Sequence, residues 1–259
     1  MGILVRNNKV ISAGGKILYS RTGDPFELPN LKLYLSATRM AQQADESSVS
    51  SFTDFSGNSF HATQGTSGNQ PKFDLNQFGS NAGIKFDGVD DKMNIIGGAL
   101  DIFRNINQYT VQILTKRNTI SDNCLDFYVT NNVNNAVRFA FGWVGANAQL
   151  VVRRLDINTS VIITYPLNDT NYHLIQVTLN PSNYTVYMYI DGVFVNSAQL
   201  TSSGNLDNTA SGQVNVGYYN VGAGSYGKSC INGISVNTSY SDPSTIQAQY
   251  RGYLQRGYL

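Results

Sequence analysis

The stretch YTVYMYIDGVFVN, residues 184–196, decides the fold class. Aliphatic residues alternate with polar or aromatic ones on both sides of Asp191-Gly192, as they do in β-strands that bury one face. Asp-Gly between two alternating runs is among the strongest short signals for a tight hairpin, because both residues tolerate positive φ. The stretch therefore predicts two antiparallel strands joined by a two-residue turn.

The same alternation extends along most of the chain. Leu31, Leu33 and Leu35 predict a strand with one buried face. Asp242 followed by Pro243 has the pattern of an N-cap and first residue of a short helix, which we expect to end near residue 250. Evenly spaced strands with one late helix predict an all-β fold, a two-sheet antiparallel β-sandwich of the jelly-roll type. The other predicted strands are 84–86, with a return strand at 93–95 after a turn, and 109–115, 125–130, 136–143, 149–155, 161–164, 173–179, 213–219 and 227–236.

The composition argues against several partners. The chain has 259 residues, a formal net charge of +1 and 14% charged residues, without a basic cluster. Nucleic acid is not expected as a partner, because phosphate binding requires clustered Lys and Arg. No run approaches the ~20 apolar residues of a membrane-spanning helix, and the first residues do not resemble a signal peptide. Whether the two cysteines, Cys124 and Cys230, form a disulfide is left open by the sequence.

Residues 1–29 differ from the rest of the chain. Short apolar fragments, such as residues 3–5 and 17–19, are broken by Asn7-Asn8 and Gly14-Gly15. Because such a segment is too short to bury its own core, we expect it to anchor the chain in an assembly and to support a homo-oligomer, with a trimer as the first expectation. The alternative is that it adds an edge strand to the main domain. That domain is predicted to span residues 30–259.

Four segments, taken in order, resemble one known superfamily. They are residues 31–37 with FTDFSGN at 52–58, IKFDGVDD at 84–91, YHLIQVT at 172–178 with YMYIDGV at 187–193, and Val216-Gly217 with the terminal helix. This order is similar to that of bacterial and phage laminin-G-like domains of the concanavalin A-like superfamily. Tyr34, Phe52 and Tyr172 stand where relatives carry Trp. The resemblance implies the β-sandwich fold, but this fold hosts lectins, adhesion modules, glycosidases, lyases and virion proteins.

Aromatic residues near glycine are the candidate ligand-binding residues. Sugars bind with a pyranose face on an aromatic ring while Asn and Asp bond the hydroxyls. Residues 218–226 combine Tyr218, Tyr219, Asn220 and Tyr226 with glycines, a composition typical of binding surfaces; an ordinary glycine-rich turn is the alternative. Trp143, the only tryptophan, lies between glycines and is equally compatible with a binding residue and with a core residue.

An acidic cluster at Asp87, Asp90 and Asp91 is the candidate metal site. Calcium prefers several carboxylate and carbonyl oxygens, and many members of the superfamily bind calcium. The geometry of an Asp-Gly turn explains the same residues without a metal, so both interpretations stay open. Calcium is the one cofactor expected from the sequence.

Catalysis is not expected from the residues available. Glycoside hydrolysis usually needs two carboxylates across the sugar bond, and the hydrolases of this superfamily place Glu residues on one strand. Here Glu27 and Glu46 are the only glutamates, one in the N-terminal segment and the other in a polar loop. His61 and His173 are the only histidines, and we expect structural roles for them.

These observations favour a non-enzymatic recognition or display module. The resemblance suggests a bacteriophage virion component, such as a tail fibre, head fibre or spike, that binds host surface glycan and contacts other virion proteins through residues 1–29. We expect it to reach the virion from the host cytoplasm. A structural decoration protein without sugar binding is the alternative, and a polysaccharide lyase or hydrolase is the third hypothesis.

Overall fold

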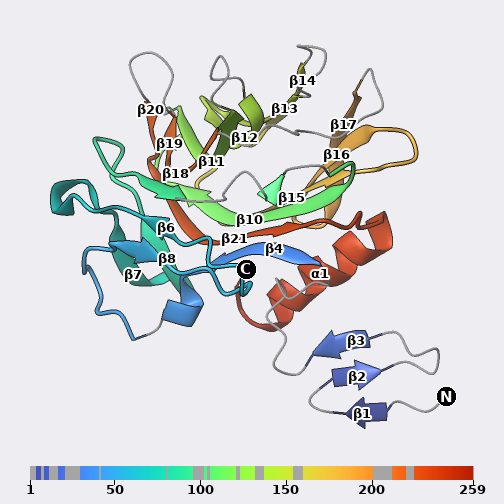
Figure 1. Ribbon diagram of the computed structural model, residues 1–259, viewed down its shortest axis with the longest axis horizontal. Coiled ribbons are helices and arrows are strands. Elements are labelled where there is room, and N and C mark those ends of the chain that lie inside the picture. The colour runs from blue at the N-terminus through green and yellow to red at the C-terminus, as the bar shows by residue number, and fades with distance from the viewer. Residues whose placement is uncertain are drawn as a thin grey trace.

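A computed structural model defines most of the chain. The described residues are 4–6, 9–11, 17–20, 30–40, 42–79, 81–95, 102–103, 106–120, 123–131, 137–153, 160–200, 212–219 and 225–258. Two stacked antiparallel sheets with one helix against them make up the main body (Figure 1). The predicted all-β sandwich is therefore confirmed.

The first sheet is built around its longest buried strand, β21, which pairs with β10 along one side. Along its other side, β21 pairs with β4 over Gly233–Asn237 and with β8 at Cys230 and Ile231. Every pairing in this sheet is antiparallel. In spatial order its strands are β17 (Val193–Gln199), β16 (Thr185–Ile190), β15 (His173–Leu179), β10 (Tyr109–Arg117), β21 (Ser229–Asn237), β8 (Asn81–Lys85) and β7 (Lys72–Phe78), with β4 (Leu31–Ser36) also beside β21.

The second sheet faces the first across the core. It is also antiparallel throughout its described pairs. Its strands in spatial order are β14 (Ser160–Pro166), β13 (Asn147–Arg153), β12 (Val137–Val144), β11 (Cys124–Asn131), β18 (Gly212–Val216), β9 (Met93–Ile95), β6 (Ala62–Thr63) and β5 (Ser51–Phe52). Two 3₁₀ turns, η1 (Thr38–Met40) and η2 (Ser67–Asn69), lie in the connections.

The predicted hairpin between β16 and β17 is present. Ile190 pairs with Val193, and Asp191 and Gly192 have φ of 53° and 73°. Two consecutive positive φ angles give the local twist that matches the twist of the flanking strands. A methyl group at Gly192 would meet the Tyr250 ring at 2.9 Å, so glycine is also required by packing.

The core lies between the sheets and is rich in aromatic rings. Phe103 stacks on Phe139 with ring centroids 5.7 Å apart, and Tyr109 meets both rings edge-on. Such arrangements are favoured by the ring quadrupoles. Cys124 and Cys230 are both buried free thiols, so no disulfide joins them.

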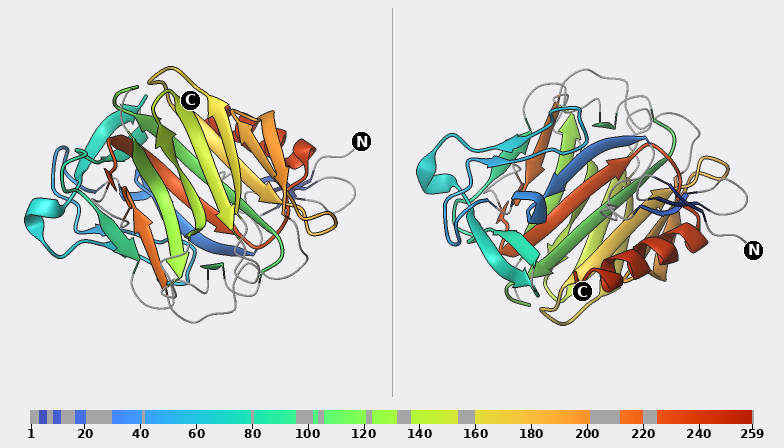
Figure 2. Two further views of the ribbon diagram at one scale, coloured as in Figure 1. Left: turned by 90° about the horizontal axis from the view of Figure 1, so that it is seen from above. Right: turned by 90° about the horizontal axis from the view of Figure 1, so that it is seen from below.

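The outer face of the first sheet is covered by helix α1 (Pro243–Gln255). Figure 2 (right) shows the helix lying across this face. Tyr253 is fully buried and belongs to a second apolar cluster with Leu114, Leu174 and Cys230, which point away from the main core. The helix thus explains why β15 is buried on both faces.

Two sequence expectations about this region were wrong in detail. The Asp242 cap with Pro243 is present, with Asp242 Oδ1 accepting from Thr245 N at 2.7 Å, but the helix continues past residue 250 to Gln255 because Tyr253 anchors its end. Likewise, β4 is not a strand with one buried face: Tyr34 on its outer side is fully buried in the second cluster.

Residues 84–95 do not form the predicted pair of neighbouring strands. The strand before the turn, β8, belongs to the first sheet, whereas the strand after it, β9, belongs to the second. Local alternation predicts strands and turns, but it does not say which sheet each strand enters. The turn at 87–91 is therefore a link between the sheets.

Three short strands near the N-terminus form a separate sheet. These are β1 (Leu4–Arg6), β2 (Lys9–Ile11) and β3 (Ile17–Ser20), paired antiparallel in that order. Within the described part of the chain they pair only with one another. The pairing gives no support to the alternative that this segment adds an edge strand to the sandwich.

Candidate functional site

Tyr218 and Tyr226 form a ring pair at one end of the second sheet. They lie opposite each other across a two-strand ribbon, β19 (Tyr218–Tyr219) and β20 (Ser225–Tyr226), with ring centroids 4.9 Å apart and tilted by 33°. Both rings are half-buried. Lys92 Nζ lies 5.1 Å from the centroid of Tyr218, within cation–π range. Burial and the neighbouring Tyr226 raise the pKa of Tyr218.

Gly217 sets the direction of this ribbon. Its φ is +72°, and a methyl group there would lie 2.3 Å from the Phe86 ring. Gly217 N donates to Asp126 O at 3.2 Å, and Gly227 N donates to Gly217 O at 2.7 Å. A side chain at residue 217 would therefore be strained and would clash, so the bend that separates β18 from β19 requires glycine.

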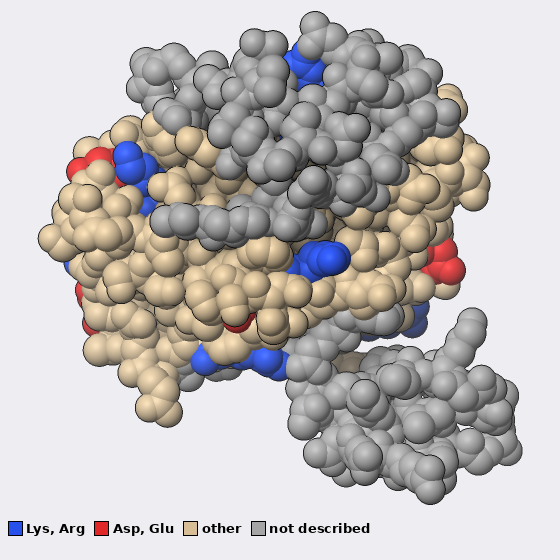
Figure 3. Space-filling view, in the orientation of Figure 1, with Lys and Arg blue, Asp and Glu red and all other residues tan. Residues whose placement is uncertain are grey.

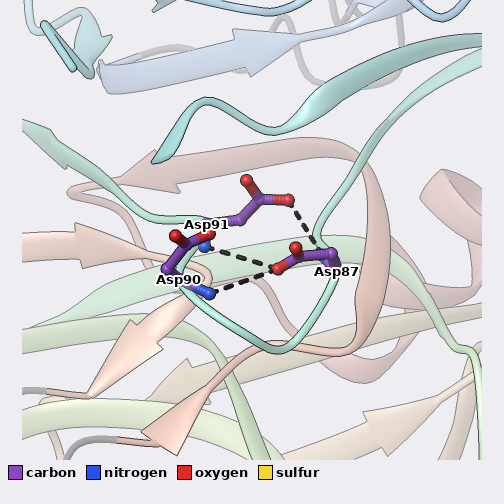
Figure 4. A group of neighbouring side chains, drawn as sticks. All are labelled: Asp87, Asp90 and Asp91. Atoms are coloured by element: carbon purple, nitrogen blue, oxygen red, sulfur yellow. Dashed lines mark hydrogen bonds between the residues drawn. The ribbon is translucent and has the colours of Figure 1, made fainter. Parts of the chain in front are cut away.

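The acidic turn at 87–91 brings three carboxylates together (Figure 4). Oxygens of Asp87, Asp90 and Asp91 lie within 4.8 Å of one another, and this is the one such group among the described residues. Asp87 Oδ1 accepts the N–H groups of Val89 at 2.8 Å, Asp90 at 3.3 Å and Asp91 at 3.4 Å. Asp91 Oδ2 accepts Asp87 N at 2.9 Å.

These contacts fit a self-contained turn better than a calcium site. Four backbone N–H groups already donate hydrogen bonds to two of the carboxylate oxygens. A calcium ion needs carboxylate and carbonyl oxygens that are free to coordinate it. Burial raises the pKa of Asp91 to about 6, and the charges of Asp87 and Asp90 add to this. Calcium binding stays a prediction, which a comparison of melting temperatures in 1 mM CaCl₂ and in EDTA tests.

The ring pair and the acidic turn are neighbours in space. Lys92, next to the turn, reaches Tyr218, while a methyl group at Gly88 would overlap the Lys228 side chain just beyond β20. We call the group Tyr218, Tyr226, Asp87, Asp90, Asp91 and Lys92 the tyrosine–aspartate site. Two stretches that the sequence offered as separate candidates thus form one site. The sequence also predicted Tyr219 and Asn220 as ligand-binding residues. The structure describes the backbone of Tyr219 but not its side chain, and Asn220 lies outside the described residues.

Trp143 is part of the core and not of this site. Its side chain is 1% exposed, so neither face of the indole is open to a sugar. Trp143 Nε1 donates to Asp126 Oδ2 at 3.0 Å, and the Arg117 guanidinium lies 5.0 Å from its centroid. Thr115 Oγ1 also donates to Asp126 Oδ2, at 2.7 Å. Burial raises the pKa of Asp126 to about 6, although these hydrogen bonds act to lower it. The core interpretation of Trp143 is the one that the structure supports.

The histidines and glutamates have structural contacts. His173 bridges Asp191 and Asp169, and His61 Nδ1 accepts Asp54 N at 3.0 Å. Glu46 pairs with Lys85 at 3.6 Å on the surface, and Glu27 lies outside the described residues. None of these four residues belongs to the tyrosine–aspartate site.

Sequence reasoning missed Lys92 and Asn215. Lys92 directly follows the acidic turn in the sequence, and this position could have predicted that it belongs to the same site. Asn215 lies on β18 between the core residues Val214 and Val216 and therefore points away from the core. It is 1% exposed, and its two amide atoms have no hydrogen-bond partner in the described structure. An amide left unpaired in this way costs about 1–3 kcal/mol, but at 1% exposure it is as closed to a ligand as Trp143.

Comparisons with known proteins agree with the fold. The binding domain of Paraclostridial Mosquitocidal Protein 1 has a TM-score of 0.63 at 12% identity, covering 86% of this chain and 52% of that chain. The binding domain of Botulinum Neurotoxin DC, in complex with SialylT, has a TM-score of 0.58 at 13% identity. The match covers 86% of this chain and 51% of that chain. CBM40 of the Ruminococcus gnavus IT-sialidase, bound to alpha2,3 sialyllactose, has a TM-score of 0.53 at 16% identity. The match covers 64% of this chain and 95% of that chain.

These likenesses define the class of fold, a lectin-like β-sandwich. The chain spans about half the length of the toxin binding domains that it matches. No family model and no curated protein sequence matches the chain. No helix in the described residues is both long and apolar enough to cross a membrane. On the face shown in Figure 3, the described surface is mostly uncharged, in keeping with the low charged fraction of the chain.

Proposed function

We propose that the protein is a non-enzymatic module that recognises glycan, and that the tyrosine–aspartate site is where the sugar binds. The observation that carries the proposal is the half-exposed ring pair of Tyr218 and Tyr226 beside three carboxylates. A tyrosine ring offers an apolar face to the C–H groups of a pyranose, while carboxylate oxygens accept its hydroxyls. The lectin-like fold and the glycan complexes of similar domains support the proposal.

The local charge favours a neutral sugar. Three lysines, Lys72, Lys92 and Lys228, lie around the turn, but the three carboxylates lie within 4.8 Å of one another, so an anionic group placed against them would meet repulsion. The sialylated ligands of the similar domains carry a carboxylate, and we expect this chain to prefer glycans without one.

The test begins with a glycan array that carries neutral and sialylated glycans, followed by calorimetry with the best ligand. Tyr226→Ala is expected to weaken binding about 30-fold, because an aromatic anchor is worth about 2 kcal/mol. Tyr172→Ala is the matched control: Tyr172 is also half-buried, pairs with Phe78 at 5.0 Å and lies under Lys116 at 5.2 Å, but it has no acidic turn beside it.

Three outcomes of this test would count against the proposal. Equal losses in Tyr226→Ala and in Tyr172→Ala would show a general loss of fold. A silent array would favour the alternative, a structural decoration protein. Cleavage of a bound polysaccharide, detected as new reducing ends or unsaturated products, would favour the third hypothesis, a hydrolase or lyase.

We further propose that residues 1–29 anchor this module in a larger assembly, such as a bacteriophage virion, where it displays the sugar site. Support comes from the separate β1–β3 sheet, which pairs within itself in the described structure, and from the resemblance to phage laminin-G-like domains. A chain that begins at Asn30 is expected to melt at nearly the same temperature and to be monomeric in light scattering, whereas the full chain forms an oligomer. Unfolding or aggregation of the shortened chain would contradict the anchor.

A further inference from the structure

A second group of aromatic side chains lies on the outer face of the first sheet, beyond the edge of helix α1. Phe194 on β17 is 52% exposed, which is unusual for so large an apolar ring. Its ring meets Tyr189 edge-on at 5.8 Å and Tyr187 at 6.3 Å. We call Phe194, Tyr187, Tyr189, Tyr240 and Asp242 the aromatic shelf.

The strand pattern explains why these rings share a face. Val186, Met188 and Ile190 of β16 point into the core, so the tyrosines between them point outward. A register shift between Met188 and Tyr189 brings Phe194 opposite Tyr189 and hence onto the same outer face. Because both strands are hydrogen-bonded into a sheet, the rings are held in place before any ligand arrives.

Polar groups border the exposed ring on the side of the helix. Burial, together with the closeness of Tyr240, Tyr187 and Asp242, raises the pKa of Tyr189 to about 12. Burial, Tyr187 and Asp242 also raise the pKa of Tyr240. The three phenol groups and the carboxylate therefore lie near one another. Asn183 Nδ2 donates to the Tyr187 hydroxyl at 3.3 Å and adds an amide to this border.

Asp242 adds an exposed carboxylate to this border. As the N-cap of α1, it uses Oδ1 to accept from Thr245 N at 2.7 Å and from Ser244 Oγ at 2.8 Å. The Thr245 side chain and the Ser244 backbone also donate to this carboxylate, and these hydrogen bonds lower its pKa. The side chain is exposed, so the ionised carboxylate faces solvent and can accept a sugar hydroxyl there.

We propose that the aromatic shelf is a second glycan-binding site, which takes a neutral pyranose on the Phe194 ring. The C–H face of the sugar would lie on Phe194, while hydroxyls at its rim reach the phenols and the exposed Asp242 carboxylate. The exposed face of the Phe194 ring suits the apolar C–H face of a pyranose. The polar groups on one side of the ring suit the hydroxyls at the edge of the sugar. A protein partner would instead need a wider apolar contact, since protein interfaces bury about 800 Å² per partner.

The inference rests on the proposed function for the kind of ligand, but it uses different residues from the tyrosine–aspartate site. Two sites on one chain would bind a long polysaccharide more tightly than a short oligosaccharide, because the second contact becomes intramolecular. A polymeric surface glycan is therefore the ligand class that this arrangement favours.

The experiment compares the full chain with Phe194→Ala, Tyr226→Ala and the double variant. Calorimetry uses the neutral hexasaccharides maltohexaose, cellohexaose and chitohexaose as probes, and then the polysaccharide of the probe that binds. We expect two molecules of hexasaccharide per wild-type chain, one per chain in each single variant and none in the double variant. Val193→Ala is the control, because Val193 is 64% exposed on the same strand and lies outside the shelf; its stoichiometry should stay at two.

The outcomes separate the two sites. Binding that is lost in Tyr226→Ala and unchanged in Phe194→Ala would overturn the shelf and leave the proposed function intact. The reverse result would support the shelf and remove the tyrosine–aspartate site. Loss of self-association in Phe194→Ala by analytical ultracentrifugation, with unchanged sugar binding, would make the shelf a protein interface and would also overturn the proposal. Circular dichroism of each variant checks that the sandwich is folded.

Discussion

His173 lies in a buried position between two carboxylates that favour its charged form. Nδ1 lies 2.8 Å from Asp191 Oδ2 and Nε2 lies 2.9 Å from Asp169 Oδ1. Two carboxylates can be satisfied at once only if both ring nitrogens carry hydrogen. Burial alone would lower the pKa of His173, but the hydrogen bonds to Asp191 and Asp169 outweigh it and raise the pKa above 6.5.

At the residue scale, we predict that His173→Ala destabilises the fold by about 3 kcal/mol, because it leaves two facing carboxylates without their cation. The contribution of His173 is fully present below pH 6.5 and is lost as the pH rises through its raised pKa, so the difference between variant and wild type should shrink above neutral pH. Urea unfolding at pH 6 and pH 9 measures this. His61→Ala is the control, since the Nδ1 of His61 bonds a backbone amide; equal effects of both variants would refute the charged bridge.

The attachment of α1 to the first sheet depends on three buried glutamines. Gln249 Oε1 accepts from Gln112 Nε2 and from Gln176 Nε2, the latter at 3.0 Å. Tyr253 completes the group by donating its hydroxyl to Gln112 Oε1 at 3.1 Å. Each amide is buried, so each needs its partner.

At the element scale, Gln249→Ala is expected to cost about 2–4 kcal/mol, since it removes the acceptor of two buried amides at about 1–3 kcal/mol per unsatisfied group. Urea unfolding measures the loss. Gln247→Ala, on the exposed side of the same helix, should change stability by less than about 0.5 kcal/mol. If both variants behaved alike, the glutamine group would not be what holds the helix.

The elements themselves were largely predictable, and their partners were not. Strand β15 was predicted at its observed bounds, 173–179, because alternation and flanking turns are local properties. The length of α1 was underestimated, because the reason it continues, burial of Tyr253 against Leu114 and Leu174, joins distant parts of the chain. The tyrosine–aspartate site shows the same limit: its two halves were predicted, but they meet because β18 pairs with β9 through Val216 and Met93.

At the scale of the whole molecule, three buried groups, Asp126, Asp91 and His173, make the fold more stable at acidic pH than at neutral pH. Burial raises the pKa of Asp126 and of Asp91 from the ordinary aspartate value of 3.8 to about 6. A carboxyl whose pKa is raised by folding binds its proton more tightly in the native state, so stability falls as the pH rises from about 4 to about 6. The loss of His173 protonation acts in the same direction at higher pH. In contrast, Asp169 and Asp242 have lowered pKa values and lose their contribution only below pH 3.8.

We therefore predict maximum stability at about pH 4, with a melting temperature several degrees higher at pH 5 than at pH 7.5. For Asp126 alone the effect is roughly 3 kcal/mol, from about two pKa units. Asp126→Asn, which keeps the shape without the charge, should melt above wild type at pH 7.5 and close to it at pH 5. Differential scanning calorimetry at both pH values measures this, and a higher wild-type melting temperature at pH 7.5 would contradict it.

The place of Trp143 also decides how binding can be observed. As the sole indole of the chain, it is the source of the intrinsic fluorescence, and its N–H group bonds the Asp126 carboxylate. Emission should therefore follow a titration near pH 6 and report the protonation of the core. Because the indole is 1% exposed, a saccharide cannot touch it, and direct quenching by a saccharide should be absent. Fluorescence is thus a sensor of the interior in this protein, and binding has to be followed by heat or by labelled sugar.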